Sequence, residues 1–153
     1  DSVMGKSFWI VLITAFVVIN ETLVDWLLAI FVGDYGVAEG FTKVTRLWTL
    51  DSVLFAAAFR AIPYGALLLV GLTTSLKRSV PGKLALWLAL LAIAAIHFWG
   101  YWGMQHSLYT TAHTSSTSAL ALIFVPIHAA WIGALTGGAV VVVTKLGGRL
   151  FKR

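Results

Sequence analysis

Four of the ionisable residues within the apolar segments of this chain are its main candidates for chemistry. They are Glu21, Asp25, Arg60 and His97. An ionisable side chain in hydrocarbon costs at least ~2.5–3.5 kcal/mol on insertion scales, so such residues usually pair with one another or line a functional path. Glu21 and Asp25 are four residues apart, which places both carboxylates on one face of a helix.

The expected depths of three of these residues are similar. Counted along their segments at ~1.5 Å per residue, Glu21, Arg60 and His97 all fall in the outer half of a core ~30 Å thick. We therefore expect an intramembrane polar layer in which Glu21 and Arg60 form an ion pair, with His97 hydrogen-bonded beside them. Two other interpretations remain open: a proton, ion or ligand path from the outer face, and acids that simply reach outer water.

The remaining polar residues predict neither a catalytic centre nor a cofactor site. Asn20 and His128 are secondary polar candidates, and His128 is expected to donate a hydrogen bond to a neighbouring helix. The four histidines show no spacing typical of a metal site, and the absence of cysteine excludes thiolate ligands and disulfides. No nucleophile elbow or phosphate-binding loop is present, so no catalytic residue, metal or cofactor is predicted.

The elements that would position these side chains are long apolar helices. The apolar fraction is 59%, well above the roughly 45–50% of soluble domains. Backbone exposed to lipid must satisfy its own hydrogen bonds, which favours helices over four unclosed strands. We predict an all-α polytopic membrane protein, one transmembrane domain over 1–153, folded as a bundle of four transmembrane helices. The expected spans are residues 8–32, 52–76, 84–103 and 117–144.

The cations predict the orientation of this bundle. Lys77, Arg78 and Lys83 lie in the second connection, and further cations precede the first span or follow the last. The positive-inside rule then places both termini in the cytoplasm. Cations at helix ends suit anionic lipid head groups, whereas nucleic-acid binding needs a basic groove or stripe, so no nucleic-acid partner is expected.

The connections carry weaker signals. Residues 33–51 contain a Gly-rich turn and then apolar residues at helical spacing, which predicts a short interfacial helix. Asp51 is expected to cap the second span. Residues 104–116 are rich in Ser, Thr and His without apolar periodicity, which predicts an exposed loop.

Small residues in the last span predict a close helix contact. Two overlapping pairs with four-residue spacing contain Gly133, Ala134, Gly137 and Gly138. Such pairs let two backbones approach, either within the monomer or between subunits.

One stretch of the sequence resembles known proteins. Ser115-Ser116-Thr117-Ser118-Ala119-Leu120, continuing to Phe124-Val125-Pro126-Ile127, looks like the start of the last helix in small, uncharacterised bacterial integral membrane proteins. The resemblance implies a location in the bacterial inner (cytoplasmic) membrane and implies no activity.

Three functions are consistent with these features. The first is a non-enzymatic accessory or immunity-type subunit that binds another membrane protein or itself, surrounded by membrane lipid. The second is a small oligomeric proton or ion transporter or channel that uses the Glu, Asp, Arg and His layer. The third is a membrane enzyme acting on lipid near His97, His106 or His113.

Overall fold

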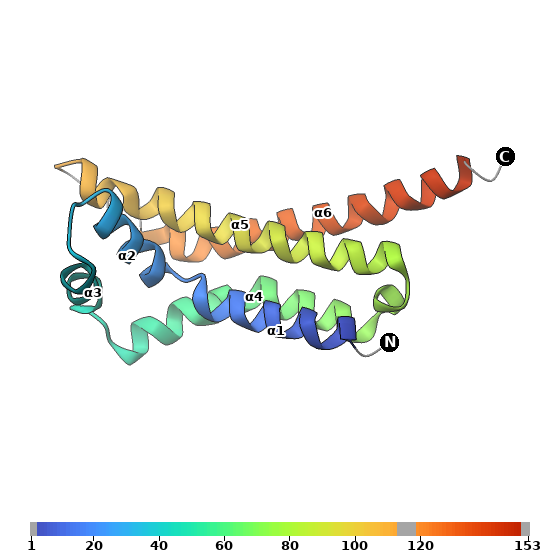
Figure 1. The fold of residues 1–153 in the computed structure, drawn as a ribbon, viewed down its shortest axis with the longest axis horizontal. Helices are drawn as coiled ribbons and strands as arrows, with labels where there is room; N and C mark the ends of the chain where they lie inside the picture. Colours follow the sequence, from blue (N-terminus) through green and yellow to red (C-terminus); the bar gives the residue numbers. More distant parts are fainter. Residues whose placement is uncertain (1–2, 113–118, 151–153) are drawn as a thin grey trace.

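The computed structural model describes residues 3–112 and 119–150, and every regular element in these two ranges is a helix (Figure 1). His113, one of the three histidines considered for a lipid-acting enzyme, lies outside the described residues. Residues 115–118, the first part of the stretch that resembles bacterial membrane proteins, also lie outside them. The elements are α1 Val3–Val18, α2 Glu21–Phe31, α3 Val37–Thr45, α4 Leu50–Thr73, the short 3-10 helix η1 Ser75–Arg78, α5 Val80–Thr110 and α6 Ala121–Leu150.

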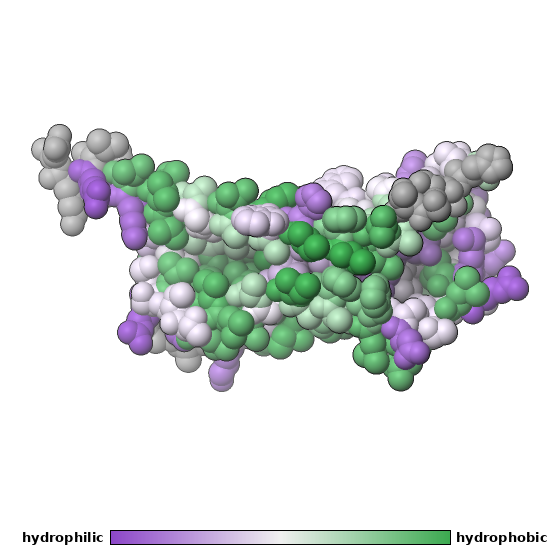
Figure 2. Space-filling view, turned by 180° about the vertical axis from the view of Figure 1, so that it is seen from behind, coloured by the Kyte–Doolittle hydropathy of each residue, from purple (hydrophilic) through white to green (hydrophobic). Residues whose placement is uncertain are grey.

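Three of the described helices, α4, α5 and α6, are long and apolar enough to cross a membrane. Helices α1 and α2 are long and apolar enough to cross a membrane only when they are taken together as one broken segment, bent by 61°. The all-helical prediction is thus confirmed, with three candidate spans or four if the bent pair counts as one. Hydrophobic side chains cover most of the central face in Figure 2, as expected for a membrane-embedded protein, and hydrophilic residues gather towards its ends.

The first predicted span, residues 8–32, was wrong as a continuous helix because the chain breaks at Asn20. The Asn20 side chain accepts a hydrogen bond from the Leu23 amide (2.9 Å) and donates one to the Val17 carbonyl (2.8 Å). It therefore caps α2 and also satisfies a carbonyl at the end of α1, which offers the backbone an alternative to continuing the helix.

The beginning of α4 differs from the prediction by two residues. Thr49, rather than Asp51, is the N-cap residue: its hydroxyl accepts from the Ser52 amide, and the Ser52 hydroxyl accepts from the Thr49 amide. This reciprocal capping box satisfies two amides that lack partners within the helix. Asp51 lies in the first turn instead, where its negative charge interacts favourably with the positive end of the helix dipole.

Helix α5 is longer at both ends than the predicted span 84–103. The expectation of a loop from Met104 was wrong, because the helix continues to Thr110. The Thr110 and Thr111 hydroxyls bond back to carbonyls four residues earlier, and Gln105 is buried against α2. Tertiary contacts and local hydrogen bonds therefore outweigh the polar composition of this segment.

The predicted short helix in the first connection is present as α3, and its interfacial location stays a prediction. The Trp26 and Phe41 rings pack in a T-shaped arrangement with their centroids 5.6 Å apart, and Trp26 donates a hydrogen bond to the Val37 carbonyl at 2.9 Å. These contacts hold α3 against α2 at one end of the molecule (Figure 1).

Helix α6 packs on α5 through the small residues that the sequence analysis selected. A Cβ atom at Gly133 would approach Ile93 Cγ1 to 2.6 Å, and one at Gly137 would meet Ala89 at 3.5 Å. One pair therefore makes a contact within the monomer. Ala134 and Gly138, the other pair, are exposed on the adjacent side of the helix.

Candidate functional site

The structure brings Glu21 and Arg60 together at the break between α1 and α2. Arg60 Nη1 donates to Glu21 Oε2 at 2.8 Å, and the Arg60 side chain is only 7% exposed. Arg60 Nε donates to the Phe16 carbonyl at 3.0 Å. The break leaves that carbonyl without its usual helical partner, so Arg60 both neutralises Glu21 and completes the hydrogen bonding of α1.

Asp25 lies one turn further along α2 and meets different partners. The Tyr109 hydroxyl donates to Asp25 Oδ1 at 2.5 Å, and Lys43 Nζ of α3 donates to that hydroxyl at 3.3 Å. The Lys43 ammonium also lies 4.4 Å from the centroid of the Tyr109 ring, a cation–π distance. Asp25 thus joins α2, α3 and α5 and does not take part in the Glu21–Arg60 pair.

The polar side chains of α5 form a row with a spacing of four residues, which we call the α5 ladder. It consists of His97, Tyr101, Gln105 and Tyr109. Residues four apart lie on one face of a helix, and this row rises ~18 Å along it. Gln105 Nε2 donates to the Glu21 carbonyl at 2.9 Å, so the ladder faces the first residue of α2.

His97 is fully buried, but it is not hydrogen-bonded to the ion pair as the sequence analysis expected. Its Nδ1 contacts the Ile93 carbonyl at 2.8 Å within its own helix, and its ring stacks on Tyr64 at 5.2 Å. Since a carbonyl can only accept, Nδ1 carries a proton in this arrangement. The four predicted residues therefore do not form one hydrogen-bonded group: Glu21 pairs with Arg60, and His97 bonds within α5. Asp25 bonds to Tyr109.

Four buried polar atoms in this region have no hydrogen-bond partner among the described residues. They are Tyr64 Oη, His97 Nε2, Tyr101 Oη and Gln105 Oε1. A buried polar atom without a partner costs about 1–3 kcal/mol, and natural proteins contain few of them. Three of these atoms lie on the α5 ladder, where ordered water, a small polar ligand or a proton path can each satisfy them.

Sequence reasoning missed Tyr64, Tyr101, Gln105 and Tyr109 as partners of the four predicted residues. The regular spacing of the ladder, which starts at His97, was a usable signal. Ending the third span at residue 103 hid it, because Gln105 and Tyr109 were then assigned to a loop.

His128 differs from its prediction. Its Nδ1 contacts the Phe124 carbonyl at 2.7 Å within α6, rather than a carbonyl of a neighbouring helix, and its side chain is exposed. A local carbonyl four residues back is always in reach on a helix, so it competes with any neighbour. The described part of the chain contains no group of three or more His, Asp or Glu residues placed to hold a metal ion.

Comparisons with protein-family models, with curated proteins and with solved structures found no match to this chain.

Proposed function

We propose that this chain is a small non-enzymatic integral membrane protein that acts by binding another membrane protein through α6. As its setting we propose a bacterial inner membrane with both termini in the cytoplasm. The distribution of charge supports this orientation: every described acid lies between residues 21 and 51. The start of α1, the η1 turn, the start of α5 and the end of α6 carry six described cations and lie at the other end (Figure 1).

The main support for this proposal is the exposure of α6. Its most apolar 18-residue stretch is 11% buried, whereas the corresponding stretch of α5 is 39% buried, although the two have similar mean hydropathy. Trp131 and Leu135 are each 68% exposed, and His128 lies on the same face. We call these three residues the α6 outer face.

His128 distinguishes this face from an ordinary lipid-facing surface. It lies ~10 Å into α6, and its Nε2 atom meets no hydrogen-bond partner among the residues that the structure describes. A polar group facing hydrocarbon without a partner is unfavourable, and a hydrogen bond to another transmembrane helix is worth about 0.6–2 kcal/mol. Because Nδ1 donates to the Phe124 carbonyl, Nε2 of the neutral ring is an acceptor, and a hydroxyl or amide donor on a second protein would supply its partner.

Site-specific photo-crosslinking in native membranes tests this proposal. With p-benzoylphenylalanine in place of Trp131, we expect one discrete crosslinked protein species, and we expect His128→Leu to reduce its yield. The matched control places the same probe at Leu91, a 64% exposed residue of α5, where no discrete species should form. Equal labelling at both positions, or lipid adducts alone at position 131, would refute the proposal.

Transport is the second candidate function, and the unpartnered atoms of the α5 ladder favour it. The ladder leads from Tyr109, which contacts exposed Lys43, inward to fully buried His97. Oxygen and nitrogen atoms in such a row can pass a proton or hold an ion.

A membrane enzyme acting on lipid gains less support, because His97 has no exposed surface and His106 lies beside Thr110 of its own helix.

Proton flux into liposomes tests the transport candidate. If the ladder conducts protons, Glu21→Gln should reduce the flux of the reconstituted protein to that of protein-free liposomes, because the carboxylate beside the ladder is lost. Glu39→Gln, which changes an exposed acid of α3, should leave the flux unchanged. An unmodified protein without flux, or equal flux in both variants, would exclude this function.

A further inference from the structure

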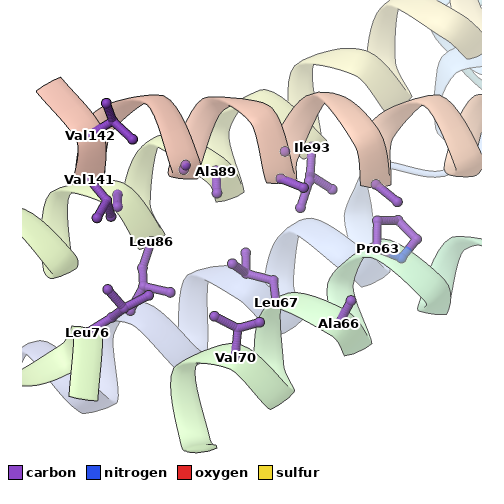
Figure 3. Close-up of a pocket in the computed structure, with 16 residues that line it drawn as sticks. Pro63, Ala66, Leu67, Val70, Leu76, Leu86, Ala89, Ile93, Val141 and Val142 are labelled. Atoms are coloured by element: carbon purple, nitrogen blue, oxygen red, sulfur yellow. The ribbon is translucent and has the colours of Figure 1, made fainter. Parts of the chain in front are cut away.

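An open apolar groove of about 540 Å³ lies between α4 and α6 (Figure 3). Its floor is formed by α5, where Leu86, Ala89 and Ile93 are each at most 5% exposed. Its two rims are exposed: Val70 on α4 is 40% accessible and Val142 on α6 is 55% accessible. The groove is separate from the α5 ladder, and no residue of the Glu21–Arg60 pair lines it.

Small residues keep this groove open. Ala66 on the α4 rim, and Ala130, Ala134 and Gly138 on the α6 rim, project at most a methyl group into the space between the two helices. A Cβ atom at Gly138 would meet nothing within 4 Å. The volume lies within the about 300–1,000 Å³ typical of pockets that hold a small molecule.

The chemistry of the lining selects an acyl chain. All sixteen lining residues are Pro, Gly, Ala, Val, Leu or Ile, so no side chain offers a hydrogen bond to a polar ligand. From Ala130 to Val142 the groove follows α6 for ~18 Å. The hydrocarbon of one leaflet is ~15 Å deep, half of a ~30 Å core, so an extended acyl chain of one leaflet matches the groove in direction and length.

Positive charge surrounds one end of the groove. Leu76, which lines it, is followed directly by Lys77 and Arg78 in η1. Lys145 lies one turn beyond the lining residue Val141 on the same face of α6. Among the described residues near this end, 68–90 and 137–149, there is no aspartate or glutamate. The opposite end of the groove, near Pro63 and Ile93, has no comparable group of cations.

We propose that the groove binds one anionic phospholipid, with an acyl chain along α5 and the phosphate group among Lys77, Arg78 and Lys145. Charge complementarity at the mouth distinguishes this occupant from a second copy of the chain, whose end at this level is equally basic. The lipid site is independent of the α6 outer face, which lies on other residues.

Native mass spectrometry of the delipidated full-length protein, titrated with phosphatidylglycerol or phosphatidylcholine, tests the lipid site. We expect one tightly retained phosphatidylglycerol per chain. Each cation near the bilayer surface contributes about a fivefold change in affinity, so Lys77→Gln combined with Arg78→Gln should weaken phosphatidylglycerol binding by about 25-fold and leave phosphatidylcholine binding unchanged. Both residues are exposed in a short turn, so this variant tests the site without disturbing the core.

A second pair of variants tests the groove itself. Gly138→Leu places an isobutyl group in the groove and should abolish the tight adduct. Gly147→Leu is the matched control, since a Cβ atom at Gly147 also meets nothing within 4 Å. Gly147 is nine residues, or about two and a half turns, after Gly138 and therefore lies on the opposite side of α6. Equal affinity for both lipids, unchanged adducts in Gly138→Leu, or a loss of dimers instead of lipid in that variant would overturn the proposal.

Discussion

Replacing Arg60 with alanine should lower the free energy of unfolding by about 3–5 kcal/mol, the largest effect that we expect from a single side chain. The substitution leaves the Glu21 carboxylate, whose side chain is 18% exposed, without its cation. It also removes the donor to the Phe16 carbonyl at the helix break. Since a stranded charge costs more than an absent pair, the double variant with Glu21→Ala should be more stable than Arg60→Ala alone.

A double-mutant cycle in detergent micelles measures this coupling. The unfolding free energies of the two single variants and the double variant are compared with that of the unchanged protein. Arg46→Ala, which removes an exposed cation after α3, serves as the control and should change stability by less than about 0.5 kcal/mol. Strictly additive losses for Arg60 and Glu21 would show that the two residues do not act as a pair.

Gly82→Ala should have the second large effect, because its new methyl group would overlap backbone rather than a movable side chain. A Cβ atom at Gly82 would collide with three backbone atoms of Leu76 in η1: the carbonyl oxygen, the carbonyl carbon and Cα. The Gly82 amide also donates to the Ser79 hydroxyl at 3.1 Å, which caps α5 and fixes the turn. Relief requires the α4–α5 connection to move, so we expect a loss of at least about 1–3 kcal/mol.

Gly103→Ala provides the matched control in the same helix, and thermal unfolding of both variants in micelles provides the measurement. A Cβ atom at Gly103 meets nothing within 4 Å, and alanine is favoured over glycine inside a helix by about 1 kcal/mol. The two substitutions should therefore shift the midpoint in opposite directions. Equal midpoints for Gly82→Ala and the unchanged protein would mean that the turn adjusts without cost.

The sequence alone predicted the fold class and the main charge pair. Apolar composition over segments of twenty or more residues leaves only helices able to satisfy their own backbone in lipid, and every regular element in the described part of the structure is a helix. The Glu21–Arg60 contact was predictable because a buried acid and a buried cation at similar depth are each unfavourable without the other. The placement of this bundle in a membrane, its orientation and its partner stay predictions.

Only the tertiary structure decided where the first segment breaks and which residues surround the pair. Uniformly apolar segments carry no periodicity that marks their buried face, so the groove between α4 and α6 could not be assigned from the sequence alone. The bond from Arg60 to the Phe16 carbonyl joins residues 44 positions apart, and it stabilises a break that Asn20 makes available locally. Local sequence offers such alternatives, and contacts between distant segments select among them.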